Sequence, residues 1–464
     1  MHNTNNKMKK TIYGIMGGLL TAALVSSCGE DRSGEYYALI TTQTWMYETM
    51  QKEYLYYQDM PNKKSLDFFK KPSDFLNSAV SSKDKKSGAT FSHIDSVYVS
   101  ARSTSQTPTF GFEGTMVRAN NGSYGIRVLY TQENSPAYEV GLKRGDIIIA
   151  ANSKKINSSD LFYITSPKEA YLFTMGKLNE KGFDTLQTVQ MPAPRIVENN
   201  NLYKSQVTDF GGKKVAYIMY NEFGNNDTEK LKELFNSLGG QPVDDIILDL
   251  RYNPGGYVTT AQMISTNLAP QEAIGNTFLK MTHNDIINRT DVLNFEQSLL
   301  ANASALSYNN LYIITSGNTA SASEVVINCL KPYMSGRLFQ VGTATFGKNV
   351  AQQLFTDEEQ APMLEFWLTN SLLSNAEDFN DYYKSGLKPD YEIAENLKGE
   401  LGELGTEQDS LMLPILKHIE TGSFPTKDET EETPETASRN IEEKLYFNSS
   451  IDLKPKSAIL ELKK

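Results

Sequence analysis

The chain has 464 residues, of which 39% are hydrophobic and 10% aromatic. This length is too great for one compact core, and the apolar content excludes a disordered chain, so about two to four folded units are expected. The 45 basic and 56 acidic residues give a formal charge of −11, which argues against a nucleic-acid partner. Two cysteines, Cys28 and Cys329, are too few for a disulfide framework, and no CxxC or histidine cluster is present, so neither a metal nor a cofactor is expected.

Residues 1–27 have the organisation of a secretory signal. Three lysines precede an uncharged stretch over residues 11–25, which is shorter than the ~20 apolar residues that span a bilayer. Small residues come before Cys28, and this arrangement resembles the lipobox of bacterial lipoproteins, in which cleavage before the cysteine exposes it for diacylation. Gly29 and the acidic pair Glu30 and Asp31, directly after the cysteine, resemble export signals of surface lipoproteins in Bacteroidetes-type bacteria. The resemblance implies a lipid-anchored protein of the cell envelope; a plain signal peptide with an incidental cysteine is the alternative.

Residues 28–107 are predicted to form a small helical N-terminal domain. From Tyr36 to about Ser105 the pattern is helical, and glycine is absent until Gly88. Large apolar residues recur near i, i+4 spacing, at Trp45, Met46, Met50, Tyr54 and Tyr57. Such a stripe is more often core than binding site.

Residues 108–198 consist of short β-like runs separated by glycine and asparagine. Ser135-Pro136 has the pattern of a helix start, Gly141 is expected to end that helix, and residues 147–151 read as a strand. The run from Ser135 onward, SPAYEVGLKRGDII, resembles a PDZ domain of the bacterial protease-associated kind. PDZ domains bind C-terminal peptides as an added strand and hold the carboxylate on backbone N–H groups, here expected near residues 110–113. A purely structural β-rich domain is the alternative.

Residues 203–420 alternate between strands and helices, which predicts an α/β layered domain. The predicted strands are 215–220, 245–250 and 310–315, and the predicted helices are 227–238, 259–268 and 325–330. Residues 421–464 contain an acidic stretch that predicts a solvated linker, and the last residues, 451–462, are expected to return as an edge strand.

Three segments of the α/β domain carry residues suited to nucleophilic catalysis. Residues 249–256 (DLRYNPGG) lead from a buried strand into a glycine loop, whose N–H groups can hold a developing oxyanion. Residues 319–324 (TASASE) place serines at a strand-to-helix turn, where helix N–H donors favour negative charge. Residues 342–348 (GTATFGK) place a lysine between apolar segments, where partial desolvation would make it a general base. Taken singly, each segment is also compatible with an ordinary turn.

Together and in this order, the three segments resemble the carboxyl-terminal processing, or tail-specific, proteases. These are serine peptidases with a Ser-Lys dyad on a crotonase/ClpP-like α/β domain. The resemblance covers most of the chain, because the helical segment, the PDZ-like run and the protease domain occur in the family's order. It implies that Ser321, and not its neighbour Ser323, is the nucleophile, that Lys348 is the base and that Gln352 orients the base. The implied oxyanion donors are the N–H groups of Ala322 and of Gly255 or Gly256.

The implied function is that of a serine endopeptidase whose substrates are polypeptides with accessible C-termini. One departure from the family pattern is Tyr252, which stands where a small residue is usual and is expected to narrow the pocket. A catalytically silent peptide-binding lipoprotein of the same fold is the alternative function. The sequence does not indicate an oligomeric state.

Other serine mechanisms fit the sequence less well. A Ser-His-Asp triad needs a histidine within reach of the serine, and only His283, with Asp285 as an acidic orienter, is a candidate. Ser-x-x-Lys runs occur at residues 82–85 and 385–388, but neither Lys-Thr-Gly nor Ser-Asp-Asn accompanies them.

Overall fold

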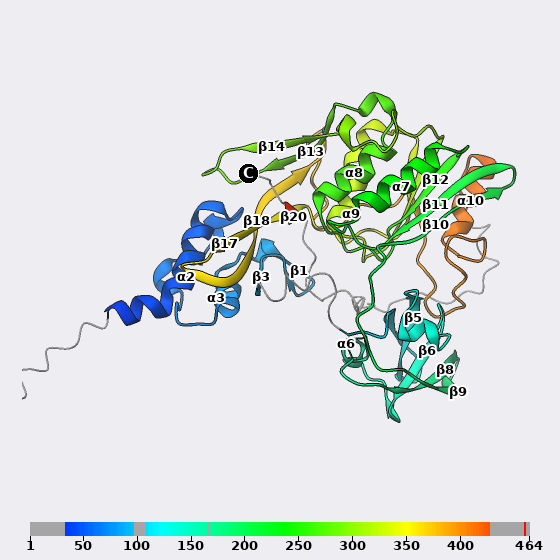
Figure 1. Cartoon of the computed structure of the whole chain (residues 1–464), viewed down its shortest axis with the longest axis horizontal. Helices are drawn as coiled ribbons and strands as arrows, with labels where there is room; N and C mark the ends of the chain where they lie inside the picture. Colours follow the sequence, from blue (N-terminus) through cyan, green and yellow to red (C-terminus); the bar gives the residue numbers. More distant parts are fainter. Residues whose placement is uncertain (1–32, 97–107, 166, 427–458, 461–464) are drawn as a thin grey trace, which may run out of the picture.

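The computed structural model describes residues 33–96, 108–165, 167–426 and 459–460. It consists of a helical N-terminal segment, a β-rich unit and a larger α/β unit, as Figure 1 shows. The predicted multidomain α/β fold is therefore confirmed. Among the helices of these residues, none has both the length and the apolar character for a membrane span. The predicted signal segment, Cys28 and most of the predicted linker lie outside the described residues.

The N-terminal segment is built on helices α2 (Ser33–Glu53) and α3 (Pro72–Ala79). Three single-turn 3₁₀ helices connect or follow them, at Tyr57–Asp59, Lys63–Ser65 and Ser82–Asp84. The predicted apolar stripe is core, because Trp45, Met46, Met50 and Tyr54 are all buried. They pack with Phe75 and Leu76 of α3 in one cluster.

The helical prediction for residues 36–105 is wrong over residues 85–96, and residues 97–105 lie outside the described part of the chain. Lys85–Lys86 (β1) and Ala89–Thr90 (β2) form a hairpin, and His93–Ser96 (β3) pairs antiparallel with strand β18 (Ala361–Ser374) of the α/β unit. These strands are short and polar, so their sequence carries no periodicity of its own. Pairing with a distant strand, which no local pattern reports, stabilises β3.

The β-rich unit is an antiparallel sheet in the order β4-β5-β6-β8-β9, with β7 paired to β6. Its strands are Phe112–Arg118, Tyr124–Thr131, Ile147–Ala151, Lys154–Lys155, Leu172–Asn179 and Gly182–Gln190. Helix α5 (Pro136–Glu139) begins at its cap Ser135, whose Oγ accepts from Tyr138 N at 3.1 Å, as the sequence predicts. Helix α6 (Asp160–Thr165) lies beside β4.

The main sheet of the α/β unit has the order β10-β11-β12-β15-β16-β19, and all its pairs are parallel except β10 with β11. Its strands are Leu202–Phe210, Lys213–Tyr220, Asp245–Asp249, Asn310–Thr315, Leu338–Gly342 and Tyr391–Glu392. Helices α7 (Thr228–Gly239), α8 (Val258–Leu268) and α9 (Ala322–Leu330) cover one face, and α10 (Met412–Thr421) covers the other. The shorter 3₁₀ turns of this unit are Gln271–Ala273, Gln297–Leu299 and Lys331–Tyr333.

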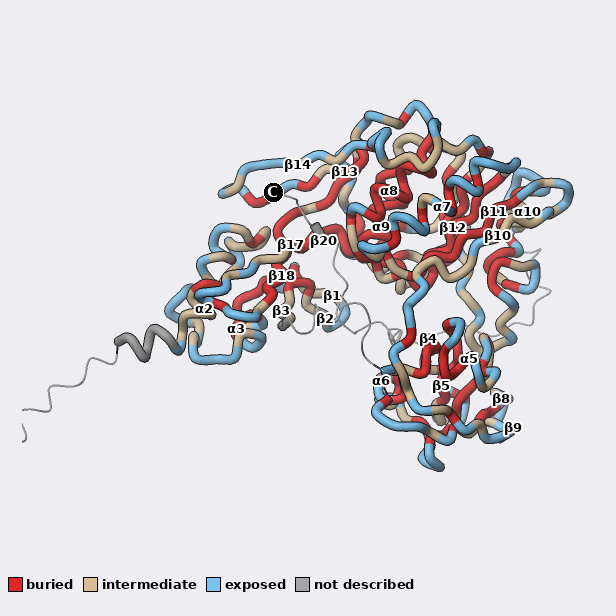
Figure 2. The backbone as a smooth tube through the Cα atoms, in the orientation of Figure 1, coloured by how far each residue is buried: buried red, intermediate tan, exposed pale blue. Residues whose placement is uncertain are grey.

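A second sheet joins the α/β unit to the N-terminal segment. Its order is β14-β13-β18-β17-β20, and β3 adds to β18. The strands not yet given are β13 (Thr277–Thr282), β14 (Thr290–Asn294), β17 (Val350–Asp357) and β20 (Ile459–Leu460). Figure 2 shows that much of β18 is buried between the two parts of the molecule. The edge strand expected near the C-terminus is β20, which pairs parallel with β17.

Candidate active site

Ser321 is the N-terminal cap of helix α9. Its φ of 58° and ψ of −116° lie in a strained region for a residue with a side chain. The residue is fully buried, and among the described residues its Oγ has no hydrogen-bond partner. The neighbouring Ser323 differs, because its Oγ donates to the carbonyl of Asn253 at 3.0 Å. Of these two serines, Ser321 is the one with an uncommitted hydroxyl.

Gly255 and Gly256 form a loop directly beside Ser321. A methyl group on Gly255 would lie 2.7 Å from Ser321 Cβ and 3.1 Å from Ala322 N, so a larger residue does not fit. Gly255 N–H donates to Asn253 Oδ1 at 2.8 Å. Within the part of the chain that the structure describes, the N–H groups of Gly256 and Ala322 have no partner. These two groups are therefore available to an oxyanion.

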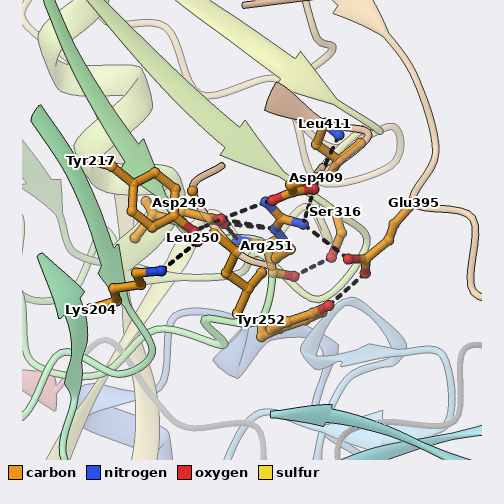
Figure 3. A network of polar contacts seen from close by, with 12 residues as sticks. Lys204, Tyr217, Asp249, Leu250, Arg251, Tyr252, Ser316, Glu395, Asp409 and Leu411 are labelled. Carbon is orange, nitrogen blue, oxygen red and sulfur yellow. Dashed lines mark hydrogen bonds and ion pairs between the residues drawn. The ribbon is translucent and has the colours of Figure 1, made fainter. Parts of the chain in front are cut away.

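A buried ion network fixes the start of this loop (Figure 3). The Arg251 guanidinium lies 2.7 Å from Asp249, 2.6 Å from Asp409 and 2.9 Å from Glu395. Burial opposes the charge, but the carboxylates dominate and raise the pKa of Arg251 well above its ordinary value. The backbone carbonyl of Arg251 also accepts from Ser316 Oγ, in the segment before the serine turn. Through Arg251, the network thus fixes both the glycine loop and the segment before the serine turn in place.

Tyr252 takes part in the same network. Its hydroxyl donates to Glu395 Oε2 at 2.6 Å and accepts from Arg144 of the β-rich unit at 2.9 Å, and its ring stacks on Tyr130. The side chain belongs to the contact between the two units. This placement does not support the expectation that Tyr252 narrows the pocket.

Lys348 is buried, with 1% of its surface exposed, and its Nζ donates to Gln352 Oε1 at 2.8 Å. The ring of Phe91, from the N-terminal segment, has its centroid 5.0 Å from Nζ. Burial lowers the pKa of Lys348 to about 7, although the charges of Asp84 and Glu324 oppose this shift. An amine with this pKa is neutral in a large fraction of molecules at pH 7 and can accept a proton.

Glu324 joins the serine turn to the lysine loop. Its Oε2 accepts from the N–H groups of Ser321 at 2.8 Å and Lys348 at 2.7 Å. Its Oε1 accepts from Thr345 Oγ1 at 2.6 Å and from Gly347 N–H at 2.5 Å. Burial raises the pKa of Glu324, and these hydrogen bonds oppose the shift. No role was assigned to this residue from the sequence, although an acid three positions after a serine is the known signal of a capped helix start.

Two more residues close to the lysine were not expected from the sequence. Gln352 Nε2 donates to Thr369 Oγ1 at 3.0 Å, and Thr369 Oγ1 donates to Asp84 Oδ1 at 2.6 Å. Asp84 and Thr369 are 285 positions apart in the chain. No local motif connects residues at such a separation, so the sequence carried no signal for this contact.

The structure brings six of the predicted site residues into one region of the α/β unit. These are Ser321, Ala322, Gly255, Gly256, Lys348 and Gln352. The seventh, Cys28, lies outside the described residues. His283, the candidate base of a histidine triad, is bonded to Asp291 at 2.9 Å and not to the expected Asp285.

The same residues fall within matches to known proteins. The sequence profile described as Peptidase family S41 matches residues 214–393, and the profile described as Peptidase S41 N-terminal domain matches residues 41–93. The chain is 28% identical over 253 residues to a carboxyl-terminal-processing protease of Picosynechococcus, a match that covers 54% of this chain and 57% of that relative. It is 25% identical over 285 residues to a protease of the same name from Synechocystis, covering 61% and 62%. The chain therefore spans less than two thirds of the length of these curated relatives.

Among solved structures, that of an S41 family protein from Bacteroides fragilis superposes with a TM-score of 0.69 at 30% sequence identity. The superposition covers 81% of this chain and 97% of the other. Both parts of the site, the N-terminal segment and the α/β unit, lie within matches to one family. The chain belongs to peptidase family S41.

Proposed function

We propose that this protein is a serine endopeptidase that works through a dyad of Ser321 and Lys348. One observation carries the proposal: one carboxylate oxygen, Glu324 Oε2, accepts from the backbone N–H groups of both Ser321, a strained serine with an uncommitted hydroxyl, and Lys348, a buried lysine whose pKa is about 7. Family membership and the protease names of the curated relatives support it.

In the proposed reaction, neutral Lys348 takes the proton of Ser321 Oγ as this oxygen attacks the carbonyl carbon of the scissile peptide bond. The protonated lysine then gives a proton to the leaving amine, and an acyl-enzyme ester remains. For deacylation, Lys348 takes a proton from the water that attacks the ester, and it returns this proton to Ser321 Oγ as the ester bond breaks and the acyl group leaves as a carboxylic acid. Gln352 Oε1 holds the amine in place throughout.

The N–H groups of Ala322 and Gly256 are the proposed oxyanion donors. Ala322 opens helix α9, so its N–H also carries the favourable end of the helix dipole. Of the two glycines named by the family pattern, Gly255 already donates its N–H to Asn253, and we assign it the role of shaping the loop.

The test is covalent labelling by a fluorophosphonate together with hydrolysis of fluorescently labelled casein. Wild-type protein should do both, and Ser321→Ala and Lys348→Ala should do neither. Ser323→Ala is the matched control two residues away, and it should still label. Casein turnover at the wild-type rate by Ser321→Ala would refute the assignment, whereas peptide binding without labelling by the wild type would favour the catalytically silent alternative.

We also propose that the β-rich unit is a PDZ-like domain that recognises substrate C-termini. Strand β4 is the outer strand of its sheet, and α6 lies beside it. Of residues 110–113, where the carboxylate is expected to bind, 110 and 111 directly precede β4, and 112 and 113 are its first two residues. An outer strand next to a helix is the arrangement that accepts an added peptide strand. In calorimetry, decapeptides with a free C-terminal carboxylate should bind. The same peptides with an amidated end lose the charged contact to the backbone N–H groups, so they should bind at least tenfold more weakly, which corresponds to about 1.4 kcal/mol of binding free energy. Equal affinities would contradict the proposal.

Residues 1–28 support a further proposal, that the protein is anchored in the cell envelope by a lipid on Cys28. In cell fractionation, the wild type should remain with membranes and Cys28→Ala should become soluble. Unchanged membrane retention of this variant would refute lipid anchoring without affecting the dyad.

A further inference from the structure

A chain of hydrogen bonds connects Lys348 to the N-terminal segment. Lys348 Nζ donates to Gln352 Oε1 at 2.8 Å, Gln352 Nε2 donates to Thr369 Oγ1 at 3.0 Å, and Thr369 Oγ1 donates to Asp84 Oδ1 at 2.6 Å. None of these four residues is more than 1% exposed. The chain therefore runs through the interior, from β17 and β18 of the α/β unit to a residue that lies outside this unit.

The last acceptor fixes the direction of the whole chain. An ionised carboxylate has no proton to give, so the Thr369 hydroxyl must donate to Asp84 and offers only lone pairs to Gln352. Gln352 must then meet Thr369 with its NH₂ group, which turns its oxygen toward Lys348. If the amide were reversed, its N–H groups would compete for the lone pair of Lys348 that has to receive the proton of Ser321.

We propose that Asp84, from the N-terminal segment, is a positioning residue for the lysine: through Thr369 it holds the Gln352 amide in the orientation that leaves the amine lone pair free for Ser321. The inference rests on the proposed Ser-Lys mechanism. It gives the N-terminal segment a part in the reaction, beyond support of the fold.

The N-terminal segment holds Asp84 from the other side. Tyr54 OH donates to Asp84 Oδ2 at 3.1 Å and accepts from Ser81 N–H at 3.0 Å. The carboxyl also bonds to the hydroxyl of Ser92, and the carbonyl of Asp84 accepts from Phe91 N–H at 2.9 Å. The carboxylate is thus placed by its own segment and presents Oδ1 to Thr369.

The charge of Asp84 also acts on the lysine. Burial raises the pKa of Asp84 to about 6, and its hydrogen bonds and the lysine charge oppose that shift. Above pH 6 the carboxylate is therefore mainly ionised, which keeps the chain directional and favours the charged form of Lys348. Other titratable groups face Asp84 and Lys348 from the elements around them. Tyr54, Tyr56 and Tyr383 lie near Asp84. Glu324 lies near Lys348, and Lys86 lies beside Gly347, the residue before Lys348.

Four variants test the inference. Thr369→Val breaks the chain and should lower kcat about tenfold to a hundredfold at nearly unchanged KM for labelled casein. Thr369→Ser keeps the hydroxyl and should restore most of kcat. Asp84→Asn keeps an acceptor but removes the charge, so the acid limb of kcat/KM should move to lower pH by about one unit. Ser371→Ala, a buried hydroxyl on the same strand whose partner is Asn370, is the matched control and should behave as wild type.

A second readout does not depend on turnover. The pKa of Lys348 is followed by NMR of protein labelled with ¹³C at lysine Cε, with the resonance assigned by its loss in Lys348→Met. It should fall by about one unit in Asp84→Asn and be unchanged in Ser371→Ala. A Lys348 pKa that does not move in Asp84→Asn would overturn the inference, as would Thr369→Val with wild-type kcat or Ser371→Ala with an equal loss. If wild-type protein neither labels nor hydrolyses casein, the proposed function fails, and the NMR titration still decides whether Asp84 acts on the lysine.

Discussion

At the scale of single residues, the burial of Lys348 lowers its pKa, which suits it to act as a base but lowers the free energy of unfolding. Its pKa is about 7 in the folded protein because of burial, against about 10.5 in the unfolded chain. The unfolded state therefore binds more protons between these values, and stability rises with pH across this window. Below pH 7 the cost of the buried lysine is fully present, about 5 kcal/mol by this shift.

Lys348→Met should therefore abolish hydrolysis and stabilise the fold at pH 6. The unpaired Gln352 oxygen costs about 1–3 kcal/mol, which leaves a net gain of about 2–4 kcal/mol. The gain should shrink as pH rises toward 10. Urea unfolding at pH 6 and pH 9.5 measures both values. A variant that is less stable than wild type at pH 6 would show that the buried amine carries no such cost.

The same pKa predicts the pH dependence of the wild type. Because the base must be neutral, kcat/KM should fall about tenfold per unit as pH decreases below about 7. Initial rates of labelled-casein hydrolysis from pH 5 to 9 give the profile, with circular dichroism at each pH as a control for unfolding. A rate that stays constant down to pH 5 would exclude Lys348 as the titrating base.

At the scale of secondary-structure elements, Glu324 at the start of α9 connects two loops through four accepted hydrogen bonds. In Glu324→Gln, one oxygen becomes an NH₂ group that faces two donors. We expect a loss of about 2–3 kcal/mol in unfolding free energy and about a hundredfold in kcat. Glu229→Gln, an exposed acid in the first turn of α7, is the matched control and should change stability by less than about 0.5 kcal/mol. Equal effects of the two substitutions would mean that Glu324 acts only on the helix dipole.

Elements stabilised by their own sequence could be predicted, and those stabilised by distant partners could not. Strands β11, β12 and β15 and helices α7, α8 and α9 lie close to the predicted bounds, because their apolar runs and 3.6-residue periods are local properties. Strand β3 was predicted as helix, because its polar sequence becomes a strand only by pairing with β18.

The same distinction applies to the site. Ser321, Lys348 and Gln352 could be located from short motifs, which act through local turn geometry. Asp84 and Thr369 lie outside the three motifs that locate the site, and only the packing of the N-terminal segment against β18 brings them together.

At the scale of the whole molecule, both smaller parts contact the supports of the site. From the β-rich unit, Arg144 bonds to Tyr252 and Glu395, next to Arg251 and the glycine loop. From the N-terminal segment, Phe91 lies against Lys348 Nζ. The site is therefore a product of all three parts, although the atoms proposed to react belong to the α/β unit.

Phe91 offers a test of this arrangement. Phe91→Leu removes part of the apolar wall around the amine, so water should reach Nζ and the pKa of Lys348 should rise by about half a unit to one unit. The acid limb of kcat/KM should then move to higher pH, opposite to the shift expected for Asp84→Asn. Phe75→Leu, a fully buried phenylalanine of α3 in the same segment, is the matched control. Both substitutions should cost about 1–3 kcal/mol of stability, but only Phe91→Leu should change the pH profile. If both variants move the acid limb equally, or neither moves it, the Phe91 ring contributes to stability alone and does not set the pKa of Lys348.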